Sequence, residues 1–250
     1  GAVIATTSQT VFTDLGRAPS TAYLYEVEAF DATGNDSPHA SVGATTAADL
    51  VMDEGGPAYG LCRPPGHHAT ADQFGGYCFL NNAAIAAQRL RDRGCSRVGI
   101  LDVDYHHGNG TQSIFYERSD VIFVSIHADP IEEFPWFAGH ADERGAGAGL
   151  GANLNLPLPC GSEPGVWFAA LDHAVEAIVA ANVDALVVSL GVDTFVDDPL
   201  GTFELATIDF TTMAERIAAI NLATVVVQEG GYAVDAIGAN VAAFLEGITT

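Results

Sequence analysis

The chain has 250 residues, enough to bury a sizeable core, and carries 32 acidic residues against 9 basic ones, a formal net charge of −23 at pH 7. All nine basic residues are arginines. Such an acidic surface repels nucleic-acid phosphates and anionic lipids, so we expect neither nucleic acid nor membrane as a partner. It suits a cationic substrate or a protein kept soluble in concentrated salt, and we hypothesise a halophilic source.

Signals for membrane insertion or secretion are missing from the sequence. No apolar run approaches the about 18 residues of a transmembrane helix, and Gly1 to Ala5 lack the basic start of a signal peptide. We therefore expect a cytoplasmic protein, and because residue 1 is not Met we expect the natural N-terminus to lie upstream. The four cysteines contain no C-x-x-C pair and are expected to be buried free thiols.

Apolar runs alternate with helical segments after a poorly patterned region, 1–40, which we predict to be mostly loop. Helices are predicted at 41–54, 82–93, 164–181, 209–220 and 233–246. Strands are predicted at 58–62, 98–101, 121–126, 153–157, 185–190 and 223–228, with 153–157 at an edge and a long loop over 131–152. Continuous runs of Val, Ile and Leu are typical of parallel strands, so we predict one α/β domain over 1–250, a mainly parallel sheet with helices on both faces.

Two carboxylates and two imidazoles follow the strand predicted at 98–101 within six residues, in the segment Asp102-Val103-Asp104-Tyr105-His106-His107. Asp104 and His106 are two positions apart, so in an extended backbone their side chains leave on one face and can bind one ion. Ligands of this kind suit Zn²⁺ or another divalent transition metal. Gly108 and Gly110 then allow a sharp turn. The alternative is a polar strand end with a capping Asp and solvated histidines.

Polar residues also follow three other predicted strands. They are His67 and His68, Asp193, and Tyr232. Ligand sites of open α/β sheets lie at the carboxyl ends of the strands, so these side chains are expected to meet. Asp104, His106 and Asp193 can then form a three-ligand metal site with open coordination positions, as a catalytic zinc requires.

This grouping predicts a hydrolytic site. The metal would polarise a carbonyl group and lower the pKa of a bound water. His67 and His68 would act as general base and acid, and Asp102 and Asn109 would orient their imidazoles. The Tyr232 hydroxyl would donate a hydrogen bond to the oxyanion. Adjacent histidines, a Gly-Gly-Tyr turn or a lone carboxylate are each often structural, and their joint occurrence at successive strand ends favours the catalytic interpretation.

Five motifs occur in this order along the chain. They are Arg63-Pro64-Pro65-Gly66-His67-His68-Ala69, Gly76-Tyr77-Cys78-Phe79-Leu80-Asn81-Asn82, Asp102-Val103-Asp104-Tyr105-His106-His107-Gly108-Asn109-Gly110-Thr111, Ser189-Leu190-Gly191-Val192-Asp193 and Glu229-Gly230-Gly231-Tyr232. They resemble the arginase/deacetylase superfamily, specifically the zinc-dependent histone deacetylase family. The segments 125–130, 134–137 and 141–143 are most similar to those of bacterial acetylpolyamine amidohydrolases, whereas region 1–40 is short and divergent.

The resemblance implies several site residues. Zinc is expected at Asp104, His106 and Asp193, with catalysis by His67, His68 and Tyr232. An aromatic channel for the aliphatic stem of the substrate is expected at Gly76, Tyr77, Phe134 and Trp136. A monovalent cation, K⁺ or Na⁺, is expected at Asp102, Asp104, His106, Ser125 and Ile126, largely through backbone oxygens.

We therefore predict a zinc-dependent amidohydrolase that removes acetyl or other acyl groups from acetylpolyamines or acetyl-lysine-like amines. A carboxylesterase that cleaves short acyl esters at the same site is the main alternative. An arginase-like di-manganese hydrolase is disfavoured by Tyr232 and the Pro64-Pro65 loop. A non-catalytic protein that binds acyl-amines is disfavoured because all catalytic residue types are present. A homodimer is left open.

Overall fold

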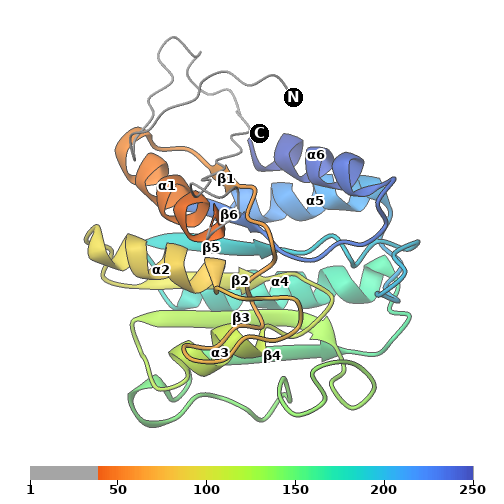
Figure 1. Ribbon diagram of the computed structural model, residues 1–250, viewed down its shortest axis with the longest axis horizontal. Helices are drawn as coiled ribbons and strands as arrows, with labels where there is room; N and C mark the ends of the chain where they lie inside the picture. Colours follow the sequence, from red (N-terminus) through yellow and green to blue (C-terminus); the bar gives the residue numbers. More distant parts are fainter. Residues whose placement is uncertain (1–38, 250) are drawn as a thin grey trace, which may run out of the picture.

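In the part of the chain that the structure describes, one parallel sheet of six strands forms the centre. The computed structural model describes residues 39–249. Its strands are β1 (Ala58–Gly60), β2 (Val98–Asp102), β3 (Val121–Ala128), β4 (Asn153–Leu158), β5 (Ala185–Leu190) and β6 (Ala223–Gln228). They pair in the order β1-β6-β5-β2-β3-β4, which Figure 1 shows from top to bottom. The predicted parallel sheet is confirmed, with β4 on an edge as expected.

Helices cover both faces of this sheet. They are α1 (His39–Glu54), α2 (Asn82–Asp92), α3 (Asn109–Phe115), α4 (Pro164–Ala180), α5 (Thr207–Ala218) and α6 (Ile237–Ile248), with a short 3₁₀ helix, η1 (Gly147–Gly149). Ile100 belongs to the core cluster shared with α1, α2 and α3, whereas the next residue, Leu101, belongs to the cluster shared with α4, α5 and α6. Successive strand residues point to opposite faces, so one continuous apolar run supplies both cores.

Local sequence accounts for several helix ends. The Asn81 side chain accepts a hydrogen bond from the Ala84 amide and so caps the start of α2. Gly55 follows α1 with φ +73°, and Asn182 and Asn221 follow α4 and α5 with φ +53° and +57°. These are the residue types that most readily adopt the left-handed conformation after a helix.

Two sequence predictions near the site are corrected. Gly108 and Gly110 were expected to allow a sharp turn. Instead Gly108 is the N-cap of α3 and Gly110 lies inside α3, a helix that we did not predict from the sequence. The last helix begins at Ile237 and not at 233, because the Asp198 carboxylate accepts hydrogen bonds from the backbone amides of Tyr232 and Ala233. The prediction for region 1–40 falls largely outside the described residues.

The sheet has a point where the strand order reverses. After β2 the chain adds β3 and β4 on one side, and it then crosses to place β5 and β6 on the other side. Open α/β sheets bind ligands beside such a reversal, at the carboxyl ends of the strands. Here Asp102, the last residue of β2, pairs in register with Ser125 on β3 and Ser189 on β5.

Within residues 39–249, no helix is long and apolar enough to cross a membrane. Three of the four cysteines are buried, and Cys160 is partly exposed. Burial raises the pKa of the Cys62 thiol to about 12. The expectation that all four cysteines are buried thus holds for three of them.

Candidate active site

Three side chains from the ends of β2 and β5 converge on one point. Asp104 and His106 follow β2 and Asp193 follows β5, and one ligand atom from each lies within 4.8 Å of the others. His106 Nδ1 is 3.1 Å from Asp193 Oδ2 and 3.4 Å from Asp104 Oδ1. The backbone of residues 104–106 is bent and not extended. Asp104 and His106 therefore converge as predicted, but because of this bend and not because of the alternation of an extended strand.

The donor set of this triad fits a divalent transition metal. Two carboxylates and one imidazole nitrogen are the ligand types of catalytic zinc sites. Both aspartates are fully buried, which is costly for adjacent negative charges unless a cation lies between them. A Cβ atom at Gly230 would lie 2.6 Å from an oxygen of each carboxylate, so only glycine fits beside these two side chains at this position.

Backbone amides fix the two carboxylates of the triad. Asp104 accepts hydrogen bonds from the amides of His106 (2.9 Å) and Gly230 (2.8 Å), and Asp193 accepts one from Tyr105 (2.9 Å). Burial, together with the Asp104 charge, raises the pKa of Asp193 to about 7. Burial also acts on Asp104, but His67 and His106 outweigh it and hold the pKa of that carboxyl below its usual value.

Two adjacent imidazoles lie beside the triad, each oriented by a different partner. His67 Nδ1 is 3.0 Å from Asp102 Oδ2, and His68 Nδ1 is 2.7 Å from Asn109 Oδ1. The two rings lie 4.0 Å apart between centroids. His67 Nε2 is 3.7 Å from Asp104 Oδ1 and so faces the triad. The pairings expected from the sequence are therefore present in the structure.

The two imidazoles have opposite pKa shifts. Burial alone would lower the pKa of His67, but the Asp104 and Asp102 carboxylates reverse this and raise its pKa well above the ordinary value. Burial lowers the pKa of His68 well below the ordinary value, and the neighbouring His67 adds to the effect. Pairs of titratable groups driven apart in this way are typical of acid–base sites.

Tyr232 lies after β6, four residues beyond Gln228. It is partly buried, and its ring lies 6.2 Å from that of Tyr77. Burial and the nearby Asp104 and Asp193 raise the pKa of the Tyr232 hydroxyl, so it stays protonated as a hydrogen-bond donor. Its backbone amide donates to Asp198 Oδ2 at 2.7 Å, which fixes this turn.

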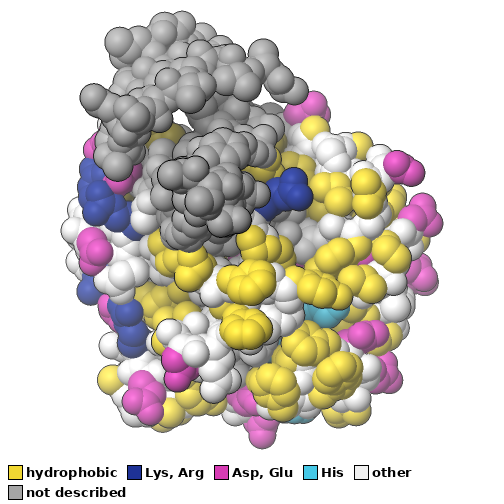
Figure 2. All heavy atoms as spheres, viewed as in Figure 1, with side chains coloured by type: hydrophobic (Ala, Val, Ile, Leu, Met, Phe, Trp, Pro, Cys, Tyr) yellow, Lys and Arg dark blue, Asp and Glu magenta, His cyan; other side chains and the backbone are white. Residues whose placement is uncertain are grey.

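Aromatic rings surround the histidine pair. Phe134 lies edge-on to His68, with ring centroids 4.8 Å apart, and Trp136 lies 5.3 Å from Phe134. Tyr77 and Trp136 are largely exposed. Figure 2 shows hydrophobic side chains gathered around a small patch of histidine atoms on this face. The four residues predicted to form a channel thus lie around the site.

Gly76 and Tyr77 form the tip of a tight hairpin. Backbone hydrogen bonds join Gly75 and Cys78 in both directions, and the two residues between them have φ of +54° and +66°. A Cβ atom at Gly76 would lie 2.3 Å from Cδ2 of His68. Only glycine therefore allows the hairpin to approach this imidazole so closely.

The residues predicted for a monovalent cation lie together at the ends of β2 and β3. Asp102 and Ser125 are register partners, and Asp102 Oδ1 accepts a hydrogen bond from the Asp104 amide. Ser125 Oγ is 2.8 Å from His127 Nδ1. These positions adjoin the triad, and occupancy by K⁺ or Na⁺ stays a prediction.

The second imidazole of the His106-His107 pair lies outside the triad. His107 is fully buried, and its ring centroid lies 4.5 Å from that of His127. Neither ring nitrogen of His107 has a hydrogen-bond partner among the described residues.

Two buried carboxylates, Asp198 and Glu229, were not assigned a role from the sequence. They bind the backbone of the loops that carry Tyr232 and His67. Only the position of Glu229 directly after a strand could have indicated this.

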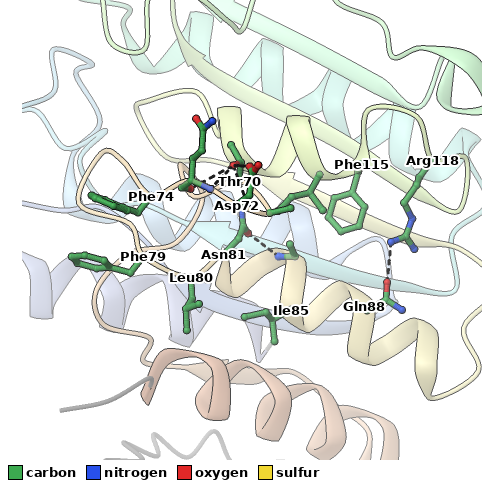
Figure 3. Close-up of a pocket in the computed structure, with 14 residues that line it drawn as sticks. Thr70, Asp72, Phe74, Phe79, Leu80, Asn81, Ile85, Gln88, Phe115 and Arg118 are labelled. Atoms are coloured by element: carbon green, nitrogen blue, oxygen red, sulfur yellow. Dashed lines mark hydrogen bonds between the residues drawn. The ribbon is translucent and has the colours of Figure 1, made fainter. Parts of the chain in front are cut away.

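A separate apolar groove of about 540 Å³ lies between the 70–81 loop, α2 and α3, and contains none of the triad. Figure 3 shows Phe74 and Phe79 at one end, where their rings stack at 5.8 Å, and Arg118 at the other, where it donates to Gln88. The 70–81 loop therefore contributes to this groove and, through Gly76 and Tyr77, to the surroundings of the histidine pair.

The chain is similar to known proteins in sequence and in fold. The sequence profile of the histone deacetylase domain matches residues 13–248, a match that begins inside region 1–40. The chain is 59% identical over 189 residues to acetylpolyamine amidohydrolase 2 of Pseudomonas aeruginosa, covering 76% of this chain and 55% of that protein. It is 52% identical over 205 residues to acetylpolyamine amidohydrolase of Mycoplana ramosa, covering 82% of this chain and 60% of that protein.

A solved structure has the same fold. The crystal structure of acetylpolyamine aminohydrolase from Burkholderia pseudomallei superposes with a TM-score of 0.82 at 49% sequence identity. The match covers 84% of this chain and 62% of that one. The chain thus spans less than two thirds of the length of these relatives.

Proposed function

This chain belongs to the histone deacetylase domain family, and from that membership we propose that it is a zinc-dependent amidohydrolase that removes acetyl groups from acetylpolyamines or related acetylated amines. The names of the relatives at 59% and 52% identity support this substrate class. The chain spans only 55% and 60% of the length of those two proteins, so that it has the activity named for them is part of the proposal.

The observation that carries the proposal is the placement of the histidine pair against the triad. His67 Nε2 lies 3.7 Å from a carboxylate of Asp104, so an acid–base group and the metal ligands face the same small volume. Acid–base catalysis requires the proton-transfer group to lie within hydrogen-bond reach of the reacting atoms. A structural metal site, closed by four protein ligands, has no use for such a pair.

Asp104, His106 and Asp193 would hold the zinc ion, which when bound supplies Lewis acidity toward the acyl carbonyl and a lowered pKa for water. We propose His68 as the general base and His67 as the general acid, the reverse of the order named from the sequence. The Nδ1 proton of neutral His68 is directed to Asn109, so its Nε2 is free to accept a proton from the attacking water. His67, hydrogen-bonded through Nδ1 to the Asp102 carboxylate, would act beside it and supply a proton to the departing amine.

Tyr232 and the aromatic residues would act on the substrate itself. The Tyr232 hydroxyl, kept protonated, would donate a hydrogen bond to the developing oxyanion. Phe134 and Tyr77 would pack against the aliphatic stem of the amine and reduce its contact with water. The net charge of −23 would favour the approach of a cationic polyamine. We also propose K⁺ or Na⁺ beside Asp102 and Ser125 as a structural ion.

A substrate panel on zinc-loaded protein tests the proposal. The panel contains acetylated polyamines, acetyl-lysine peptides and nitrophenyl acetate, with metal content measured in the same preparations. We expect one zinc ion per chain and the highest kcat/KM on acetylpolyamines. Preference for the ester would indicate a carboxylesterase, and binding of acetylamines without turnover would indicate a binding protein.

A further inference from the structure

A buried carboxylate outside the triad holds the loop that carries His67. Glu229 follows β6 directly, and only 5% of its surface is exposed. Its Oε2 atom accepts hydrogen bonds from the backbone amides of Gly66 (2.6 Å) and His67 (3.0 Å). Its Oε1 atom accepts one from the Ser189 hydroxyl at 3.1 Å. These three hydrogen bonds of the carboxylate are thus directed at one loop and the end of β5.

This arrangement fixes the peptide of His67 from both sides. The His67 N–H donates to the Glu229 carboxylate. The His67 carbonyl accepts hydrogen bonds from the amides of Gly110 (3.0 Å) and Thr111 (3.1 Å) in α3. Between β1 and α2 the chain forms no helix or strand, only the short hairpin at 75–78, which lies beyond His67 and His68. Leaving backbone amides unpaired in this buried region would cost free energy, so the carboxylate determines where the loop lies.

Glu229 also connects two parts of the candidate site. β1 pairs with β6, so the loop after β1 begins beside the strand that ends next to Glu229. Three residues after Glu229 the same segment presents Tyr232. Glu229 therefore links the loop of His67 to the segment that carries Tyr232, although its side chain touches neither the imidazole nor the hydroxyl.

We propose that Glu229 is a positioning residue, which sets the distance between the histidine pair and Tyr232 by accepting the Gly66 and His67 amide protons. The proposal rests on the proposed function, because it assigns to Glu229 the alignment of groups that act in the hydrolysis. Misalignment of acid–base groups by about 1 Å is sufficient to lower turnover by up to two orders of magnitude.

Two substitutions of similar size separate positioning from packing. In Glu229→Gln, the amide oxygen can accept both backbone protons and the NH₂ group can donate to Ser189, so all three contacts survive without the charge. In Glu229→Leu, the volume is retained and all three contacts are lost. Glu229→Asp withdraws the carboxylate by one methylene and serves if the Leu variant does not fold. Ser189→Ala is the matched control, because it removes only the contact that does not involve the loop.

Each variant is loaded with zinc and assayed for metal content, kcat and KM on an acetylpolyamine, and hydrogen exchange of the Gly66 and His67 amides. We expect Glu229→Leu or Glu229→Asp to keep zinc and KM within twofold, to lose at least tenfold in kcat and to exchange both amides at least tenfold faster. Glu229→Gln should restore kcat to within about threefold and return exchange to the wild-type rate, and Ser189→Ala should match wild type.

Three outcomes would overturn the proposal: unchanged kcat in the Leu or Asp variant, amide exchange that does not accelerate, or a Gln variant as slow as the Leu variant. A wild-type protein without turnover on any acetylated amine would instead overturn the proposed function. In that case amide exchange and the low-field proton resonance of His67 Nδ1–H still report whether Glu229 positions the loop.

Discussion

The Nδ1 atom of His68 lies 2.7 Å from Oδ1 of Asn109, so a neutral amide orients this imidazole. The amide oxygen only accepts, and Nδ1 must therefore carry the proton and leave Nε2 unprotonated in the neutral ring. The adjacent His67 is oriented by a carboxylate, Asp102. The Asp102 carboxylate contributes to the raised pKa of His67, whereas His68, beside a neutral amide, has a pKa that burial and the neighbouring His67 lower.

The first prediction is that Asn109→Asp raises the pKa of His68. A carboxylate at hydrogen-bond distance stabilises the imidazolium, typically by about 1–3 pKa units. As pH falls, His68 would then become protonated, and so stop acting as a general base, at a higher pH than in the wild type. We expect the acid limb of the kcat/KM profile of the zinc-loaded enzyme to move upward by about one unit or more. An unmoved acid limb would show that His68 does not act as the base.

Much of the fold follows from sequence because both cores are built from the same apolar runs. Val98 to Leu101 supplies alternate residues to the two faces, and this continuous pattern is typical only of a sheet covered on both sides. The sequence did not indicate α3, because its first residues are Asn109 and Gly110, both weak helix formers. Close approach explains the glycine: a Cβ atom at Gly110 would lie 2.2 Å from the Ala69 carbonyl oxygen.

The residues of the candidate site could be named from motifs at strand ends, but their supporting contacts could not. Asp198 and Glu229 act through backbone amides that lie 34 and 163 residues away in the chain, so no local spacing indicates these contacts, and only the position of Glu229 after a strand marks that residue. Contacts of this kind depend on the tertiary arrangement of loops, which propensity and periodicity do not describe. The same holds for Gly76, whose closeness to His68 appears only in the folded chain.

The second prediction is that Asp193→Ala abolishes metal binding and activity. The substitution removes one of three ligands and leaves His106 with one carboxylate neighbour in place of two. Zinc per chain, measured after dialysis against buffered metal, should fall well below half of the wild-type value. Asp172→Ala, which removes an exposed carboxylate paired with Arg216, is the control and should keep its zinc. Full zinc occupancy in the Asp193 variant would remove this residue from the site.

The third prediction is that Tyr232→Phe keeps zinc but slows amide hydrolysis. Only the hydroxyl is lost, while the backbone contact of residue 232 with Asp198 is preserved. Removal of one oxyanion donor lowers kcat by about 10²–10³-fold. Turnover on an acetylpolyamine with unchanged metal content measures this loss. Near-normal kcat would assign Tyr232 a structural role.

The fourth prediction compares two adjacent glycines. Gly76→Ala places a methyl group 2.3 Å from the His68 ring, at a residue with φ +54°. Gly75→Ala meets nothing within 4 Å. We expect at least a tenfold loss in kcat for the first variant and less than twofold for the second, with zinc content unchanged in both. Equal activity of the two variants would show that the hairpin moves away from His68 without consequence.

The fifth prediction concerns salt and follows from the imbalance of charge. Among residues 39–249, five arginines form ion pairs with aspartates, for example Arg89 with Asp49 and Arg91 with Asp120, yet the formal net charge of the chain is −23. Like charges on a compact surface repel one another and destabilise the folded state. The Debye length falls from about 10 Å at 0.1 M salt to about 3 Å at 1 M, so added salt screens most of this repulsion.

The melting temperature should therefore rise between 0.1 and 2 M KCl. A bound K⁺ would add to the effect, because an ion that binds only the folded state stabilises it by mass action. Comparison with the chloride of a bulky organic cation at equal ionic strength separates the two contributions, since screening responds to both salts and a specific site only to K⁺. A melting temperature that stays flat or falls in both salts would rule out adaptation to salt. The acidic surface would then be better explained by attraction of cationic polyamines.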